Sequence, residues 1–341
     1  MMMNKYLAIF LAASLATLGI GCASETQTQS PSQLNRLGLT DPIEVVLSGY
    51  GPPTSSFSQG LTHIGNRLEA AFGEAVEVHY VYNILDLGYA NASAQIELVE
   101  NNALTLGYVT MSTGIPALEL AALPFLFSDN DSVRAAMDGA LGQAAVESIE
   151  ANSNLRILGF YENGFRHISN SVRPVHVPAD LKDIKIRVLA IQERPFQLMG
   201  AAPEVTPLPA VVPGLASGEL EGQENPFENV ATYGMYHHQK YYTKTYHSYM
   251  SRPIFVNRTT FDAWPLSFQR EFRAAVREAI SLQRSLHDQA EIDSEVIIKE
   301  SGGEVVELTA QQRQQFVDAV TPIYEEARST YSAELLEHIG L

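Results

Sequence analysis

Residues 163–188, NGFRHISNSVRPVHVPADLKDIKIRV, combine a strand pattern with two arginines, Arg166 and Arg187. In the run IKIRV at the end of this stretch, polar and apolar residues alternate, which predicts a strand with Lys185 and Arg187 on one face. A guanidinium offers five N–H donors in a planar fork that fits a carboxylate through two parallel hydrogen bonds. The stretch therefore indicates a carboxylate-binding strand, and a weak surface ion pair is the alternative for either arginine.

Strand and helix patterns alternate along the rest of the chain, which predicts an α/β fold. Apolar runs predict strands at residues 43–47, 76–81, 104–111, 155–160, 205–208 and 220–225. Helical spacing of apolar residues predicts helices at 61–72, 90–101, 189–199 and 209–217. Such βα units form open sheets that bind ligands where strands end and helices begin.

The longest helical pattern runs from Ser267 to about Lys299. Its apolar residues recur every four positions from Phe268 to Ile280, and a helix of this length spans on the order of 45 Å. We expect it to cross more than one lobe. A coiled-coil dimer is the competing interpretation, but no heptad continues beyond Ile280.

The composition of the chain indicates a globular protein and argues against one class of ligand. The chain has 341 residues, of which 45% are apolar and 18% charged, so it can bury a large core. Its net charge of −17 argues against a nucleic-acid ligand.

The N-terminal segment is typical of an export signal. Lys5 precedes an apolar run, Tyr6–Ile20, and small residues follow around Cys22, the only cysteine. We expect a signal peptide over residues 1–22 and a flexible tether over 23–41. Cys22 is either lipidated after cleavage or removed with the signal, and a lone cysteine excludes an internal disulfide.

Four sequence blocks together resemble the extracytoplasmic solute receptors of tripartite ATP-independent periplasmic (TRAP) transporters, the DctP-type family. They are LPFLF at Leu123–Phe127, the stretch quoted above, LEGQENP at Leu220–Pro226 and YHHQKYYTKTYHSY at Tyr236–Tyr249. The resemblance implies an α/β, two-lobed periplasmic-binding-protein architecture with a ligand cleft between the lobes and a long brace helix spanning both. We expect lobe I to comprise 42–163 and 251–285, and lobe II 164–250 and 286–341.

The resemblance also implies a ligand shell. Arg187 would make the two-pronged contact to a substrate carboxylate, Arg166 would add a second donor, and Asn225 would bind the same end. Glu224 either accepts a hydroxyl of the ligand or opposes the arginines, or it forms a structural pair within the strand turn.

Weaker candidates surround these residues. Tyr161, Phe227 and Tyr236 either enclose the ligand or belong to the core. Thr113 lies in a turn that faces the cleft in the family, or it is an ordinary turn residue. The family pattern is lost at Leu189-Ala190-Ile191 and at residues 210–215, so we expect an altered pocket for the far end of the ligand.

The histidines His237, His238 and His247 are the main candidates for a metal site or for acid–base catalysis. Neighbouring residues of a strand point to opposite faces, so these histidines form no clear three-ligand set, and no HExxH or GxSxG motif accompanies them. We therefore expect neither an enzyme nor a cofactor or metal.

The predicted function is a periplasmic solute-binding subunit that captures an organic acid anion, such as a C4-dicarboxylate, a sugar acid or a keto or hydroxy acid. The resemblance implies delivery to an integral membrane TRAP permease driven by a sodium gradient. The alternatives are a binding protein of an ATP-driven amino-acid importer, in which Glu224 meets the ammonium group, and a secreted histidine-dependent hydrolase.

Overall fold

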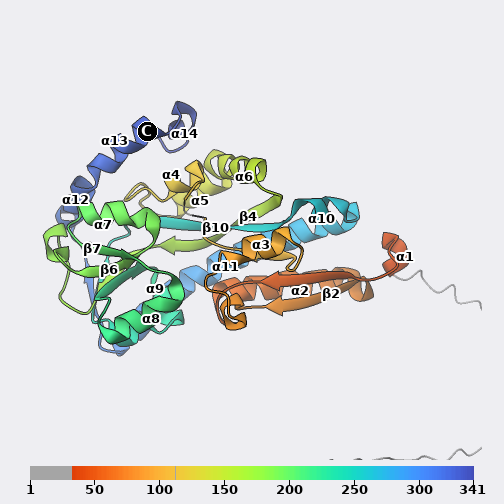
Figure 1. Cartoon of the computed structure of the whole chain (residues 1–341), viewed down its shortest axis with the longest axis horizontal. Coiled ribbons are helices and arrows are strands. Elements are labelled where there is room, and N and C mark those ends of the chain that lie inside the picture. The colour runs from red at the N-terminus through yellow and green to blue at the C-terminus, as the bar shows by residue number, and fades with distance from the viewer. Residues whose placement is uncertain (1–32, 112) are drawn as a thin grey trace, which may run out of the picture. The chain divides into compact units, whose positions relative to one another are not determined.

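Two β-sheets organise the chain in the computed structural model, which describes residues 33–111 and 113–341 (Figure 1). In the first sheet the order is β2 (Val76–Val81), β1 (Ile43–Ser48), β3 (Leu106–Tyr108), β10 (Tyr249–Asn257) and β4 (Leu155–Phe165). In the second the order is β11 (Glu304–Glu307), β9 (Tyr241–Lys244), β5 (His167–Asn170), β8 (Gly222–Asn225), β6 (Lys185–Val188) and β7 (Ala202–Val205). This arrangement confirms the predicted α/β class.

Both sheets mix strand directions. In the first, β1 is parallel to β2 and β3, whereas β10 is antiparallel to β3 and β4. In the second, β6 is parallel to β7 and β8, and β5 is antiparallel to β8 and β9. Parallel neighbours bring the carboxyl ends of β6, β7 and β8 to the same edge, where a ligand site is expected.

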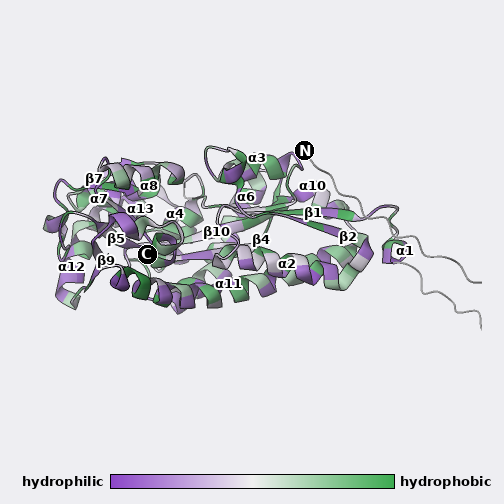
Figure 2. Cartoon of the chain, turned by 90° about the horizontal axis from the view of Figure 1, so that it is seen from below, coloured by the Kyte–Doolittle hydropathy of each residue, from purple (hydrophilic) through white to green (hydrophobic). Residues whose placement is uncertain are grey.

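Helices cover the sheets. They are α1 (Gln33–Leu37), α2 (Ser56–Phe72), α3 (Ala94–Glu100), α4 (Pro116–Ala121), α5 (Asn130–Asp138), α6 (Ala140–Asn152), α7 (Glu193–Leu198), α8 (Leu208–Ser217), α9 (Phe227–Thr232), α10 (Arg258–Ala263), α11 (Leu266–Glu300), α12 (Ala310–Ala319), α13 (Thr321–Thr330) and α14 (Ala333–Glu337). Figure 2 shows α2 and α11 on one side of the first sheet and α3, α6 and α10 on the other. Throughout the described part of the chain, each helix is too short or too polar to cross a lipid bilayer.

The chain passes from one sheet to the other at Arg166, which separates β4 from β5, and returns between β9 and β10. The two crossings are hydrogen-bonded to each other: Arg166 N donates to Ser248 O at 2.9 Å, and His247 N donates to Arg166 O at 3.2 Å. The lobe boundaries expected at 163/164 and 250/251 fall inside β4 and β10, within a few residues of these crossings. The lobe division itself stays a prediction, and the expected signal peptide, most of the tether and Cys22 lie outside the described residues.

The long helix is confirmed as α11, which has 35 residues. It packs on α2 and β4 beside the first sheet and on α9 and β11 beside the second. Its buried residues are apolar from Phe268 to Ala279 and then become polar at Gln283 and His287. The apolar pattern ends there because the helix crosses the junction of the sheets: Gln283 Nε2 donates to Glu162 O at 2.8 Å, and Glu162 N donates to Gln283 Oε1 at 2.9 Å.

Several predicted boundaries were wrong. The strand expected at 205–208 is β7, which ends at Val205, because Pro207 and Pro209 lack the N–H that a ladder needs and instead begin α8. The helix expected from residue 90 begins at Ala94. His237 and His238 belong to a 3₁₀ helix, Met235–His238, and not to a strand.

Gly164→Ala should strongly destabilise the protein. Gly164 has φ +82°, and a Cβ there would lie 2.0 Å from His287 Nε2. Left-handed backbone and overpacking together predict a loss of about 2–5 kcal/mol in the free energy of unfolding, measured with urea. Gly88→Ala is the control, because Gly88 has φ +89° but open space around it, and should lose only about 1–2 kcal/mol. Equal losses in the two variants would contradict tight packing at this junction.

Stability should fall on the alkaline side of neutrality because of His287. Burial by itself would lower the pKa of His287, but hydrogen bonding to Glu228 at 2.5 Å and the charges of Glu228, Glu291 and Glu162 outweigh it and raise the pKa to about 9. The folded state therefore favours the protonated imidazole, whose ordinary pKa is 6.5. The stabilisation, on the order of 3 kcal/mol, is complete below pH 6.5 and is lost as the pH rises through 9.

Urea unfolding at intervals from pH 6 to pH 10 measures this slope. His287→Gln should flatten it, since the neutral amide cannot titrate. A wild-type profile that is level across this range would refute the assignment.

Candidate functional site

A cavity of about 590 Å³ is lined by residues from both sheets. Elements beside the first sheet contribute Tyr50, Leu85, Asn91, Ala92, Ser93, Val109, Thr110, Asn163 and Arg252. Elements beside the second contribute Arg166, Arg187–Ala190, Val205–Pro209, Asn225, Asn229 and Tyr233. Three of these lining residues are arginines and none is an aspartate or glutamate, so the cavity is suited to an anion.

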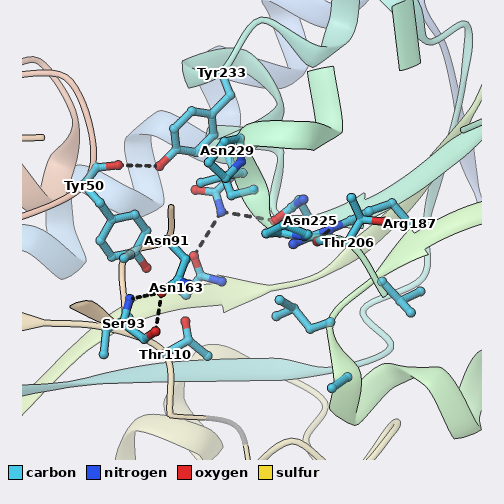
Figure 3. Close-up of a pocket in the computed structure, with 18 of the residues that line it drawn as sticks. Tyr50, Asn91, Ser93, Thr110, Asn163, Arg187, Thr206, Asn225, Asn229 and Tyr233 are labelled. Atoms are coloured by element: carbon cyan, nitrogen blue, oxygen red, sulfur yellow. Dashed lines mark hydrogen bonds between the residues drawn. The ribbon is translucent and has the colours of Figure 1, made fainter. Parts of the chain in front are cut away.

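Arg187 projects from the carboxyl end of β6 into this cavity (Figure 3). Its side chain is 3% exposed, and its Nε donates to Thr206 O at 2.8 Å. Its Nη1 and Nη2 have no hydrogen-bond partner among the described residues. Burial lowers the pKa of Arg187 to about 10, so the group stays charged near neutral pH with two terminal nitrogens available to a ligand.

Arg166 is directed mainly toward Glu224. Its Nε pairs with Glu224 Oε2, and its Nη2 donates to Glu224 Oε1 at 2.9 Å and to Asn225 Oδ1 at 3.0 Å. Both members of the pair are buried. Burial would raise the pKa of Glu224, but Arg166 and His247 outweigh it and lower it to about 2, so the carboxylate is ionised. In the structure Glu224 therefore opposes one of the two arginines, Arg166, and a contact of Glu224 with the ligand stays a prediction.

Three asparagines connect the two sides of the cavity. Asn229 Nδ2 donates to Asn163 Oδ1 at 3.1 Å and to Asn225 Oδ1 at 3.2 Å, which joins β4 to α9 and β8 (Figure 3). All three are buried. Because Asn225 Oδ1 also accepts from Arg166, the amide of Asn225 is held in one orientation beside Arg187.

The opposite wall comes from loops and strands of the first sheet. Figure 3 shows Tyr50, Ser93 and Thr110 on one side of the pocket and Arg187, Thr206 and Asn225 on the other. Tyr233 Oη donates to Tyr50 O at 3.2 Å and closes one end of the pocket.

The remaining predicted site residues do not line this cavity. Tyr161 is buried against Phe57 and Tyr108 in the core, and Phe227 packs on His167 and Tyr242. Tyr236 lies against His237, and Thr113 is exposed and lines a different hollow beside α13. Tyr161 and Phe227 are buried in the core, whereas Tyr236 is only partly buried at its edge.

The histidines do not form a metal centre. His247 is fully buried beside Glu224, with Nε2 3.4 Å from Oε2, and burial lowers the pKa of its imidazole, which favours the neutral form. Within residues 33–111 and 113–341, no group of three or more His, Cys, Asp or Glu side chains could hold a metal ion.

Sequence reasoning missed Asn163, Asn229, Tyr233 and Arg252. Asn163 is the first residue of the stretch quoted above, Asn229 and Tyr233 lie close to recognised blocks, and nothing in their spacing distinguishes these three residues as part of a site. Arg252 gave a usable signal: it is the only charged residue in the strand-like run YMSRPIFVN, where a buried cation needs a partner.

Comparison with known proteins gives a consistent result. The sequence pattern of bacterial extracellular solute-binding proteins, family 7 (DctP), matches residues 64–330. The chain is 32% identical over 242 residues to the 2,3-diketo-L-gulonate-binding periplasmic protein YiaO of Escherichia coli, covering 69% of this chain and 72% of the relative. It is 26% identical over 310 residues to the C4-dicarboxylate-binding periplasmic protein DctP of Rhodobacter capsulatus, covering 87% and 90%.

A solved structure shows the same fold. The TRAP periplasmic solute-binding protein of a Bordetella species, which contains density assigned to pantoate, superimposes with a TM-score of 0.80 at 26% identity and covers 87% of this chain and 98% of its own. Both the sequence pattern and the fold are those of receptors that bind solutes and not of enzymes. The chain therefore belongs to the DctP family of bacterial extracellular solute-binding proteins, the solute receptors of TRAP transporters.

Proposed function

We propose that this protein captures an organic acid anion in the cavity between its two sheets, with Arg187 as the carboxylate anchor. The observation that carries the proposal is that Arg187 is buried and charged, yet its two terminal nitrogens have no hydrogen-bond partner in the described part of the chain. A carboxylate would supply both the countercharge and two acceptors. Asn225, held beside Arg187 with its Oδ1 already accepting from Arg166 and Asn229, would donate from Nδ2 to the same end of the ligand.

The relatives support this ligand class. YiaO is named for 2,3-diketo-L-gulonate and DctP of Rhodobacter capsulatus for C4-dicarboxylates, and the Bordetella structure has density assigned to pantoate. Each of these compounds carries a carboxylate. The rest of each compound differs, as expected if members of the family share the arginine that binds the carboxylate and differ in the residues of the opposite cavity wall.

An amino acid fits the cavity less well. Its ammonium group would need a nearby carboxylate, and the described lining of the cavity contains none. Glu224, the candidate for that role, is buried against Arg166. The cavity therefore favours an organic acid over an amino acid as the ligand.

Closure and delivery complete the proposed function. A ligand that contacts both walls favours the closed form because it gains contacts there that the open form lacks. The closed receptor would then dock on an integral membrane TRAP permease, with α11 joining the two lobes. We expect the protein to act in the periplasm, with lipid attachment at Cys22 as one of two open alternatives.

Replacing Arg187 should remove binding without unfolding the protein. A thermal-shift screen of monocarboxylates, dicarboxylates, sugar acids and keto acids first identifies a ligand, because binding raises the melting temperature. Calorimetry should then show that Arg187→Gln weakens binding by about 30-fold or more, since a buried charged contact costs about 2–5 kcal/mol to remove.

Lys185→Gln is the matched control for this experiment. Lys185 lies on the same strand as Arg187, but its side chain is exposed. Its loss should leave the affinity unchanged. If Arg187→Gln binds as tightly as the wild type, the carboxylate anchor is not Arg187.

Glu224→Gln separates a structural role from a ligand-contacting role. It leaves the buried charge of Arg166 without its partner, so we expect a loss of about 3–5 kcal/mol in the free energy of unfolding without ligand, measured with urea. Glu204→Gln, at an exposed residue of β7, should change it by less than about 0.5 kcal/mol. A Glu224 variant with unchanged stability and weakened binding would instead make Glu224 a direct ligand contact.

A further inference from the structure

The cavity holds a second unpaired cation on the wall opposite Arg187. Arg252 lies on β10, the strand between β3 and β4 in the first sheet, and its side chain is 4% exposed. Among the described residues it forms no ion pair and no hydrogen bond, and its Nε is a buried donor without a partner. A buried guanidinium in a central strand is costly unless something compensates its charge.

Aromatic rings compensate only part of that cost. The guanidinium carbon of Arg252 lies 4.1 Å from the centroid of the Phe57 ring and 5.0 Å from that of Tyr50. Rings interact with the faces of a guanidinium, whereas its N–H donors lie in the plane and point outward from the edges. The rings therefore hold the cation in place and leave its donors for another group.

The charges of the arginines that line the cavity indicate that the missing partner of Arg252 is an anion. Of the three arginines that line the cavity, Arg166 is neutralised by Glu224, so Arg187 and Arg252 are left. A ligand with a single carboxylate would neutralise one of the two.

The two cations are also separate centres. Arg187 is hydrogen-bonded to Thr206, whereas Arg252 stacks on Tyr50 and Phe57. Arg187 is on a strand of the second sheet and Arg252 on a strand of the first. One small carboxylate at Arg187 would therefore leave Arg252 uncompensated.

We propose that Arg252 binds a second anionic group of the ligand, so that the protein selects organic acids with two acidic groups over acids with one. This inference rests on the proposed function, because it takes Arg187 as the anchor for the first carboxylate. It adds a contact from the opposite wall, so that closing the two halves on a dianion brings each charged end of the ligand to its own arginine.

Matched pairs of acids test the proposal by calorimetry at pH 7.5, where both acidic groups are ionised. The pairs are linear dicarboxylates from succinate to pimelate with the monocarboxylates of equal chain length, and galactarate with galactonate. In the pair that fits best, the wild type should bind the diacid about 10- to 100-fold more tightly than the monoacid, as expected for one charge-assisted contact. Arg252→Gln should remove this preference, by weakening the diacid and changing the monoacid less than about threefold.

Further variants sharpen the test. Arg252→Lys keeps the charge but not the planar fork, so it should retain part of the preference. Arg187→Gln should weaken both members of the pair. Arg270→Gln, at an exposed arginine of α11, is the control and should behave as the wild type.

Stability without ligand gives an independent readout. A merely structural Arg252 would make Arg252→Gln melt at a lower temperature than the wild type. If Arg252 instead pairs only with a ligand, the ligand-free Arg252→Gln variant should have the same melting temperature as the wild type or a higher one, because the substitution removes an uncompensated buried charge.

Each outcome decides the matter. If the wild type binds carboxylates through Arg187 but prefers the diacid of no pair, or if Arg252→Gln keeps the preference or weakens both members of a pair equally, the inference about Arg252 is overturned and the proposed function stands. If the wild type binds none of these acids, the proposed function itself fails, and the inference fails with it.

Discussion

The buried ion pair between Arg166 and Glu224 is the interaction on which the site depends. Arg166 lies at the residue where the chain leaves the first sheet, and its backbone is hydrogen-bonded to the returning crossing at His247 and Ser248. Its side chain reaches Glu224 and Asn225 at the end of β8. Arg166 thus connects the point where the chain crosses between the sheets to β8 of the second sheet and to Asn225 in the cavity lining. Breaking such a buried pair leaves an uncompensated charge, so the geometry is strongly held.

This pairing gives the two neighbouring arginines different roles. Arg166 uses its Nε and one terminal nitrogen within the protein, whereas Arg187 uses only its Nε. The countercharge of Glu224 is close to Arg166, so the cavity keeps a net positive character without an acidic residue in its lining. The acidity of the chain as a whole does not oppose this, because exposed charges are screened over about 10 Å whereas buried ones act at short range.

The polar residues on the buried face of α11 also hold the two sheets together. Where the helix crosses the junction of the sheets, Gln283 satisfies the backbone of Glu162, and His287 pairs with Glu228. Glu228 also accepts a hydrogen bond from Ser56 N at the start of α2. These contacts join elements of both sheets through directional bonds, where an apolar interface would specify fewer distances and angles. The helix is therefore a brace that depends on polar contacts at its centre.

Local patterns in the sequence were sufficient for the α/β class, the strand that carries Arg187 and the long helix, because alternation and helical spacing depend only on neighbouring residues. They failed at Val205–Leu208, where prolines change the hydrogen bonding, and they could not show which arginine is free. That was decided by the tertiary structure, since Glu224 lies 58 residues from Arg166 in the chain and pairs with it only when β5 and β8 are neighbours. Arg252 lines the cavity for the same reason, because β10 takes its place between β3 and β4 only in the folded chain. Burial and ion pairing across long separations in the chain, which no local pattern encodes, pair Arg166 with Glu224 and leave Arg187 and Arg252 without an ion pair among the described residues.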